Sequence, residues 1–332
     1  MPWTETVTMQ RLDFIRACRA GTQSVASLCR QFGISRRTGY KWLQRFDPDN
    51  LHSLENQSRA RLTSSRVILP DLADRLISLR QAHPDWGPKK IRHWLINAGE
   101  PEPLPAASTI GSLLAREGLI PARKVRRRTP GNAAGLTDIR CVNQVWSADF
   151  KGWFRLGDRS LCRPFTLTDN QSRYLLACEA GTRESGEFVR LNLERAFREY
   201  GLPDVLRTDN GHPFAGNGIA GLSQLNVWLM KLGILPERIR KGHPEENGRH
   251  ERMHRSLKAA LACGNIFTTH AEQQAWFDAY RREFNGERPH EAHGGKTPGS
   301  VWQRSAREWD GRVPEIVYPE GSRLCRVQNK GV

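Results

Sequence analysis

The sequence predicts a multidomain protein in which an all-α region of the helix-turn-helix kind precedes an α/β core built on a mixed sheet. Apolar residues recur at helical spacing as far as about residue 120. After residue 140 strand-like segments with a two-residue period alternate with helical ones. The length of 332 residues leaves room for about two or three domains. The predicted domains are residues 1–55, residues 66–120, a basic linker at 121–142, the core at 143–304 and a short β tail at 305–332.

The first helix-turn-helix is predicted within SVASLCRQFGISRRTGYKWLQRF, residues 24–46. Its first half has apolar residues at helical spacing, Gly33 provides a turn, and Ser35 can cap a second helix. The apolar side of that helix is predicted to contain Tyr40, Trp42, Leu43 and Phe46. We predict that its other side contacts the DNA major groove through Arg36, Arg37, Thr38 and Lys41. The alternative is an ordinary helical hairpin with a solvated charged face.

Three more helices are predicted at residues 71–83, 87–99 and 107–118. Ser108 is expected to open the last of them and Gly118 to close it. Together they form a second helix-turn-helix-like domain, which either binds DNA or serves only for packing. The basic stretch that follows is predicted to bind phosphates through Arg126, Arg127 and Arg128.

The net charge is strongly positive, at +16 with a pI of about 10.1, which favours a polyanionic partner over a merely soluble basic surface. Residues 1–135 hold 22 Lys or Arg against 11 Asp or Glu, so the excess is concentrated in the predicted DNA-binding part. The seven cysteines show no C-x-x-C spacing, which is typical of reduced thiols in a cytosolic protein. No leader or long apolar segment is visible, so we expect neither secretion nor membrane insertion.

The core is predicted to alternate strands and helices. The predicted elements are, in order, strands within 143–156, 163–170 and 173–181, a helix within 183–201, a short strand within 203–214, and helices near 222–232 and 247–262. The first two residues of a hairpin turn after the second strand are Asp169 and Asn170. This order is typical of a layered α/β sandwich with a mixed sheet.

Three carboxylates fall on three different elements of this core. Asp149 lies in the first strand, Asp209 ends the strand VLRTDNG, and Glu251 lies one turn into the last helix. Carboxylates brought together in this way can hold two divalent cations for in-line phosphoryl chemistry. Oxygen ligands favour Mg²⁺ or Mn²⁺.

The segments WSADF, RTDNG, PEENGRHERMHRSLK and EFNGERPHEAHGGKTPGSVW resemble the catalytic core of insertion-sequence transposases in the retroviral-integrase superfamily. The resemblance extends to the helix-turn-helix region and implies an RNase H-like core fold. It places Asp149, Asp209 and Glu251 at the family's catalytic and metal-ligand positions, with two Mg²⁺ or Mn²⁺ ions expected. Asp169 is interpreted as a structural residue of the hairpin.

The family's usual spacing creates an alternative for the third carboxylate. The chain has 41 residues between Asp209 and Glu251, whereas Glu245 gives the 35 that are common in relatives. The N-G-x-x-E pattern of the family nevertheless matches Glu251, and a loop insertion near 215–224 would account for the additional residues. We therefore favour Glu251. Arg255 and Lys258 share its helix face and are predicted to hold DNA phosphates, unless that face is only solvated.

A competing zinc site is suggested by H-E-x-x-H, since His250 and His254 flank Glu251 at the spacing of helical zinc ligands. Glu272 could be a third ligand. The metzincin-type continuation is missing, because Leu257 occupies the position of its Gly. The motif also explains neither upstream Asp. We therefore expect the histidines to face DNA or solvent.

The resemblance implies a transposase that binds the terminal repeats of its own mobile element and cleaves and joins DNA at target sites. It further implies a homodimer or larger synaptic assembly and a cytoplasmic, nucleoid-associated location in a bacterium. The alternative is an inactive or domesticated transposase that acts as a sequence-specific DNA-binding protein or repressor. Residues 314–332 alternate like a strand and then show a hairpin-turn signal without a returning strand, so we hypothesise a C-terminal truncation.

Overall fold

The computed structural model describes residues 7–56, 68–101, 103–120, 135–216, 221–263, 267–315, 320–321 and 323. Contacts divide the chain into two compact units, Met1–Val67 and Ile68–Val332. Each unit is described separately below.

The first unit contains α1 (Val7–Ala20), α2 (Val25–Gln31) and α3 (Arg36–Arg45), followed by a 3₁₀ turn at Leu51–Leu54. Its core consists of Phe14, Ile15, Leu28, Cys29, Trp42 and Leu54. The helix-turn-helix predicted from the sequence is present, and Ser35 caps α3 as expected by accepting a hydrogen bond from the Thr38 backbone N–H. The sequence analysis did not predict α1.

The predicted apolar side of α3 was wrong at Tyr40, whose surface is 59% exposed. Gly39 is buried in its place. A Cβ atom at this position would lie 2.5 Å from the Cys29 sulfur and 3.0 Å from the Phe14 ring. The close approach of α3 to its neighbours therefore requires glycine, and this rotates Tyr40 towards the surface.

The second unit begins with α4 (Pro70–Ala82), α5 (Pro88–Asn97) and α6 (Ala107–Arg116), as predicted. They enclose a small core of Leu76, Trp86, Ile91, Leu95, Ile110, Leu113 and Leu114. Ser108 does not open the last helix, because Ala106 is its N-cap and Ser108 lies within its first turn. Gly118 closes the helix with a positive φ of 70°, as expected of a C-terminal glycine.

The sheet of the second unit is mixed, as predicted. Its strands are β1 (Val145–Phe150), β2 (Phe154–Arg155), β3 (Leu161–Asp169), β4 (Leu175–Gly181), β5 (Val205–Thr208) and β6 (Leu235–Arg238). Strand β3 pairs antiparallel with β1, β2 and β4, whereas β1 pairs parallel with β5, and β5 with β6. The long β3 strand and the parallel β1–β5 pair place the ends of β1 and β5 next to each other.

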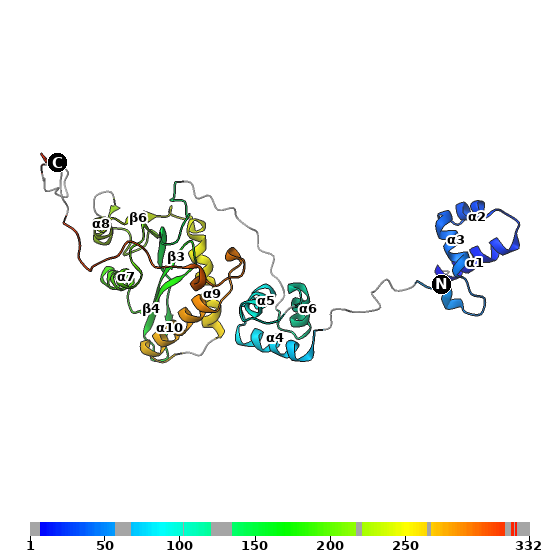
Figure 1. The fold of residues 1–332 in the computed structure, drawn as a ribbon, viewed down its shortest axis with the longest axis horizontal. Helices are drawn as coiled ribbons and strands as arrows, with labels where there is room; N and C mark the ends of the chain where they lie inside the picture. Colours follow the sequence, from blue (N-terminus) through cyan, green and yellow to red (C-terminus); the bar gives the residue numbers. More distant parts are fainter. Residues whose placement is uncertain are drawn as a thin grey trace. The chain divides into compact units, whose positions relative to one another are not determined.

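Helices cover both faces of the sheet (Figure 1). α7 (Gly186–Tyr200) and α8 (Gln224–Lys231) pack on one face, while α9 (Gly248–Cys263) and α10 (His270–Gly286) pack on the other. The shorter elements are the 3₁₀ helices η3 (Pro244–Asn247) and η4 (Glu291–His293) and the helix α11 (Pro298–Val301). None of the described helices is both long and apolar enough to cross a bilayer.

Helix α10 and strand β6 were not predicted from the sequence, although the sequence of α10 has a recognisable helical pattern. Its apolar residues Phe277, Tyr280 and Phe284 lie on one helix face, and Thr269 and Glu272 form a capping box at its start. Residues 305–315 contain no strand. Most of the remaining predicted β tail lies outside the described residues.

Strands β1 and β3 carry different chemistry on their two faces. Trp146 and Ala148 of β1 belong to the apolar core under α7 and α8. The alternate β1 residues Ser147 and Asp149 must then point to the α9 side, where Ser147 donates a hydrogen bond to Asn247. On β3, Thr168 lies opposite Ser147, and Thr166 lies opposite Asp149. The α9 side of the sheet therefore contains a polar patch in an otherwise apolar core.

Candidate metal and catalytic site

Asp149 lies near the end of β1 on this polar patch, with 17% of its side-chain surface exposed. Burial, as the largest cause, and the negative charges of Asp209 and Glu251 together raise the pKa of its carboxyl to about 8. The structure thus brings the three carboxylates predicted from the sequence within electrostatic reach of one another. They come from a central strand, the residue after its parallel neighbour, and the first turn of α9.

Asp209 is held in a tight turn directly after β5. Its carboxylate accepts a hydrogen bond of 2.9 Å from the Gly211 backbone N–H. A Cβ atom at Gly211 would lie only 3.0 Å from the Asp209 carboxylate, so the turn favours glycine here. The neighbouring Asn210 side chain donates to the Ile239 carbonyl and ties the turn to the chain after β6.

Glu251 lies in the first turn of α9 on a half-buried side of the helix. Glu245, the alternative third carboxylate, lies in η3 and pairs with the His243 ring at 2.8 Å. The charges that raise the pKa of Asp149 include that of Glu251. The effect of Glu251 on the pKa of Asp149 therefore favours Glu251 over Glu245 as the third carboxylate. Residues 217–220 of the suggested loop insertion lie outside the described residues.

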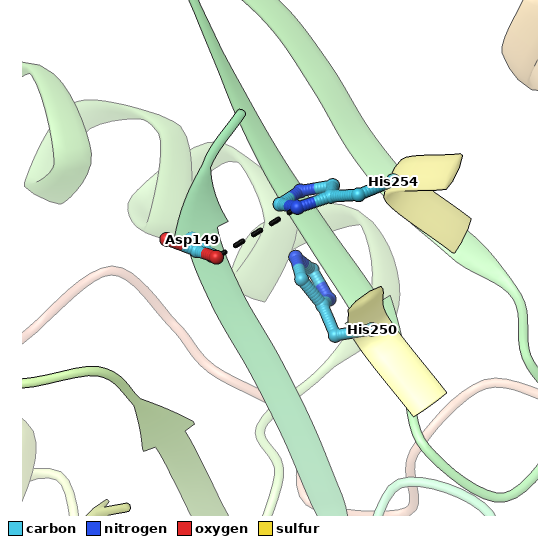
Figure 2. A group of neighbouring side chains, drawn as sticks. All are labelled: Asp149, His250 and His254. Carbon is cyan, nitrogen blue, oxygen red and sulfur yellow. Dashed lines mark ion pairs between the residues drawn. The ribbon is translucent and has the colours of Figure 1, made fainter. Parts of the chain in front are cut away.

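His250 and His254 do not face DNA or solvent, and that expectation was wrong. Both are 1% exposed and point from α9 onto the sheet, towards the Asp149 carboxylate (Figure 2). They lie on one helix face with the core residues Met253 and Leu257. This stripe at i, i+3, i+4 and i+7 is visible in the sequence and indicates the buried side of α9.

The histidines form hydrogen bonds with two threonines of β3. Thr166 Oγ1 lies 2.9 Å from His250 Nε2 and 2.7 Å from His254 Nε2. Thr168 Oγ1 lies 2.7 Å from His250 Nδ1. Burial lowers the pKa of His250 to about 3 and lowers that of His254 as well, so both rings are neutral at physiological pH. The sequence analysis did not single out either threonine.

Ligand atoms of Asp149, His250 and His254 lie within 4.8 Å of one another, which makes them a candidate metal group among the described residues. Glu272, the third zinc ligand suggested by the sequence, is not part of this group. Glu272 accepts hydrogen bonds from the backbone N–H groups of Thr268 and Thr269 and caps α10. Three nearby carboxylates, one with a raised pKa, instead provide the oxygen donors that Mg²⁺ or Mn²⁺ prefers.

Asp169 has the structural role predicted for it. It is fully buried, and its carboxylate accepts hydrogen bonds from the Asn143 N–H at 2.9 Å and from the Ser172 N–H at 2.7 Å. The Ser172 hydroxyl donates to the same carboxylate. Asp169 therefore holds the β3–β4 turn together.

The predicted DNA-contacting residues are distributed over several elements. Arg36, Arg37 and Lys41 are exposed on α3, whereas Thr38 is half-buried and its hydroxyl bonds with Ser35. Arg255 and Lys258 are exposed on α9. The three remaining predicted residues lie outside the described part of the chain: Arg126, Arg127 and Arg128.

Two family models described as integrase core domain match residues 140–244 and 232–298, and they cover the sheet, the carboxylates and α9. A helix-turn-helix domain model matches residues 10–61, and a homeodomain-like domain model matches residues 38–114. Residues 140–298 of the chain thus match the integrase core domain, which supports a member of the integrase superfamily. The family and fold class predicted from the sequence are thereby confirmed.

Relatives of this integrase-superfamily chain are encoded by insertion elements. An uncharacterized 31.7 kDa protein of insertion element IS407 from Burkholderia multivorans is 30% identical over 151 residues, 45% of this chain and 52% of the relative. An uncharacterized 39.2 kDa protein of IS476 from Xanthomonas euvesicatoria is 26% identical over 225 residues, 67% of this chain and 62% of the relative. The chain thus spans between half and two thirds of the length of these relatives.

Solved structures that resemble the chain include retroviral integrases. The catalytic core domain of BIV integrase matches with a TM-score of 0.36 and 20% identity, over 48% of this chain and 93% of that one. The HTLV-2 integrase catalytic core domain in complex with magnesium matches with a TM-score of 0.37 and 18% identity, over 48% of this chain and 97% of that one.

Proposed function

We propose that this integrase-superfamily chain is a DNA transposase that binds the ends of its mobile element and catalyses metal-dependent cleavage and strand transfer. The observation that carries the proposal is the convergence of Asp149, Asp209 and Glu251 at the ends of β1 and β5 and the start of α9. Burial of Asp149 and the negative charges of the other two carboxylates raise the pKa of Asp149 to about 8. Such a cluster of like charges is unfavourable by itself and becomes favourable when it holds cations. Membership in a superfamily with insertion-element relatives supports the same function.

The three carboxylates Asp149, Asp209 and Glu251 would together hold two Mg²⁺ or Mn²⁺ ions. The ions would supply activation of the attacking water or 3′-OH and stabilisation of the leaving 3′ oxygen. The chain itself positions the DNA. Arg255 and Lys258 are exposed four and seven residues after Glu251, where they can bind phosphates next to the scissile bond.

The helix-turn-helix provides the proposed recognition of the element ends. Exposed Arg36, Arg37 and Lys41 at the start of α3 form a basic surface of the kind that enters a major groove. Joining two ends requires two active sites close together, so the proposed working form is a homodimer or larger assembly on double-stranded DNA.

The function is tested by a strand-transfer assay in Mg²⁺ with DNA from the flanks of the gene. We expect the wild type to join these ends to target DNA and Asp149→Asn to be inactive while binding the ends as tightly as the wild type. Binding without any cleavage or joining by the wild type would instead support the inactive DNA-binding protein or repressor.

Recognition by α3 is tested separately with Arg37→Ala. We expect Arg37→Ala to bind the element ends more weakly. If Arg37 binds a phosphate, the slope of log Kd against the logarithm of the salt concentration should also fall by about one. A loss of discrimination against mismatched ends, by about 1–3 kcal/mol, would show that it contacts a base. Lys231→Ala removes an exposed cation from α8 and is the control. Equal effects of the two variants would contradict the assignment.

A further inference from the structure

The hydrogen bonds around Thr166 determine which nitrogens of the two buried histidines carry a hydrogen. Its hydroxyl contacts the Asp149 backbone carbonyl at 3.1 Å, His250 Nε2 at 2.9 Å and His254 Nε2 at 2.7 Å. A hydroxyl has one hydrogen to donate and two lone pairs to accept with. Three contacts therefore use its full capacity.

Only one placement of the hydrogen atoms satisfies all three contacts of the Thr166 hydroxyl. A backbone carbonyl can only accept, so the Thr166 hydrogen must go to the Asp149 carbonyl. Both imidazoles must then donate from Nε2. A neutral imidazole carries a single N–H, so the Nδ1 atom of each ring has a bare lone pair.

The two lone pairs meet different partners. His250 Nδ1 accepts a hydrogen bond from the Thr168 hydroxyl at 2.7 Å, so both nitrogens of that ring are occupied. His254 Nδ1 instead faces the Asp149 carboxylate oxygen Oδ2 at 3.7 Å (Figure 2). This separation is too long for a direct hydrogen bond. The repulsion between these two atoms is relieved by a proton on the Asp149 carboxyl in the metal-free protein, or by a metal ion that binds both atoms.

We propose that His254 Nδ1 is a nitrogen ligand of the metal ion held by Asp149, an inference that rests on the proposed function. Ligand bonds of about 2.0–2.2 Å allow two ligands of one ion to lie up to about 4.3 Å apart, so the observed separation is compatible with a shared ion. His250 is excluded because both its nitrogens are bonded. The Thr166 hydroxyl, which accepts the Nε2–H of His254, fixes the orientation and tautomer that a ligating histidine needs.

A nitrogen donor changes the metal preference of a site made otherwise of carboxylates. Imidazole binds Mn²⁺ and later divalent metals better than Mg²⁺, which favours oxygen ligands and water. The selectivity of the wild type for Mn²⁺ over Mg²⁺ should therefore exceed that of a variant without this ring, and we expect the loss of the ring to weaken Mn²⁺ binding by at least about tenfold.

The test uses Mn²⁺ added to the metal-free full-length protein without DNA, with pulsed EPR detection of nitrogen nuclei coupled to the ion. We expect a ¹⁴N coupling in the wild type that changes to the ¹⁵N pattern when only the histidines are ¹⁵N-labelled. His254→Gln should lose this coupling, because its amide can still donate to Thr166 but offers no imidazole nitrogen. His250→Gln, which changes the other ring bonded to Thr166, should keep the coupling.

The outcomes separate this inference from the proposed function. Mn²⁺ that binds the wild type but not Asp149→Asn, and that shows no histidine coupling, would overturn the role of His254 and leave the carboxylate site intact. A coupling that survives in His254→Gln and disappears in His250→Gln would also overturn it. If the wild type binds Mn²⁺ no better than Asp149→Asn does, both the inference and the proposed metal site fail. A labelled wild type that binds Mn²⁺ without histidine coupling overturns the inference even if a variant does not fold.

Discussion

Replacing Glu251 by Gln is expected to reduce strand transfer in Mg²⁺ by about a thousandfold or more, while Glu245→Gln keeps nearly full activity. The Glu251 side chain lies close enough to Asp149 to raise its pKa, so it belongs to the same cluster of negative charge. Gln has a similar shape but no charge, and a cation held by the cluster loses one of its anionic ligands.

The two glutamates form a matched pair for this experiment, because they lie six positions apart and receive the same substitution. Glu245 already pairs with His243 in η3, and its replacement should affect only that local contact. Strand transfer is measured at saturating DNA, with end binding measured in parallel to show that both variants fold. Loss of activity in Glu245→Gln with retention in Glu251→Gln would assign the third carboxylate to Glu245.

The contribution of Asp149 to the stability of the metal-free protein is expected to fall as the pH rises from about 4 to about 8, and Asp149→Asn is expected to remove this contribution. Below about pH 6.5 the buried His250 and His254 act in the opposite direction, because burial lowers their pKa values, so the fall is measured as the difference between the wild type and Asp149→Asn. Folding raises the pKa of Asp149 from its ordinary value of 3.8 to about 8, so between these values the Asp149 carboxyl holds more protons in the folded state than in the unfolded state. Such a group favours folding fully below the lower value, and its contribution is lost as the pH rises through the upper one. The contribution of this one group to the free energy of unfolding changes by at most about 1.4 kcal/mol per pH unit.

Urea denaturation of the metal-free protein across this pH range measures the effect. Asp149→Asn should be more stable than the wild type at pH 8, and Mg²⁺ should stabilise the wild type but not the variant, because the ion neutralises the same carboxylate. Asp138→Asn changes an aspartate whose side chain is 80% exposed and should retain the wild-type slope. Equal slopes for Asp149→Asn and the wild type would mean that the carboxyl titrates at an ordinary pH in the folded protein.

Predictions from the sequence succeeded where a pattern among neighbouring residues is compatible with only one local structure. The period of the apolar residues located most helices and strands, and the predicted N-cap Ser35 opens α3. The predictions failed where the pattern was ambiguous or a neighbour decided the outcome. Ser108 has the right chemistry for an N-cap but lies inside its helix, and Tyr40 is exposed because Gly39 provides the close packing.

In the candidate site, too, some features could be predicted from the sequence and others depended on the tertiary structure. By itself the sequence predicted the superfamily and most of the order of its elements, and it singled out Asp149, Asp209 and Glu251 as the proposed metal ligands, because these motifs are local and ordered along the chain. Only the tertiary structure decided what His250 and His254 do. The hydrogen-bond partners of a histidine determine its tautomer, and here the decisive partner is Thr166, 84 and 88 positions away in the chain and reached only after β3 pairs with β1 and α9 packs on the sheet.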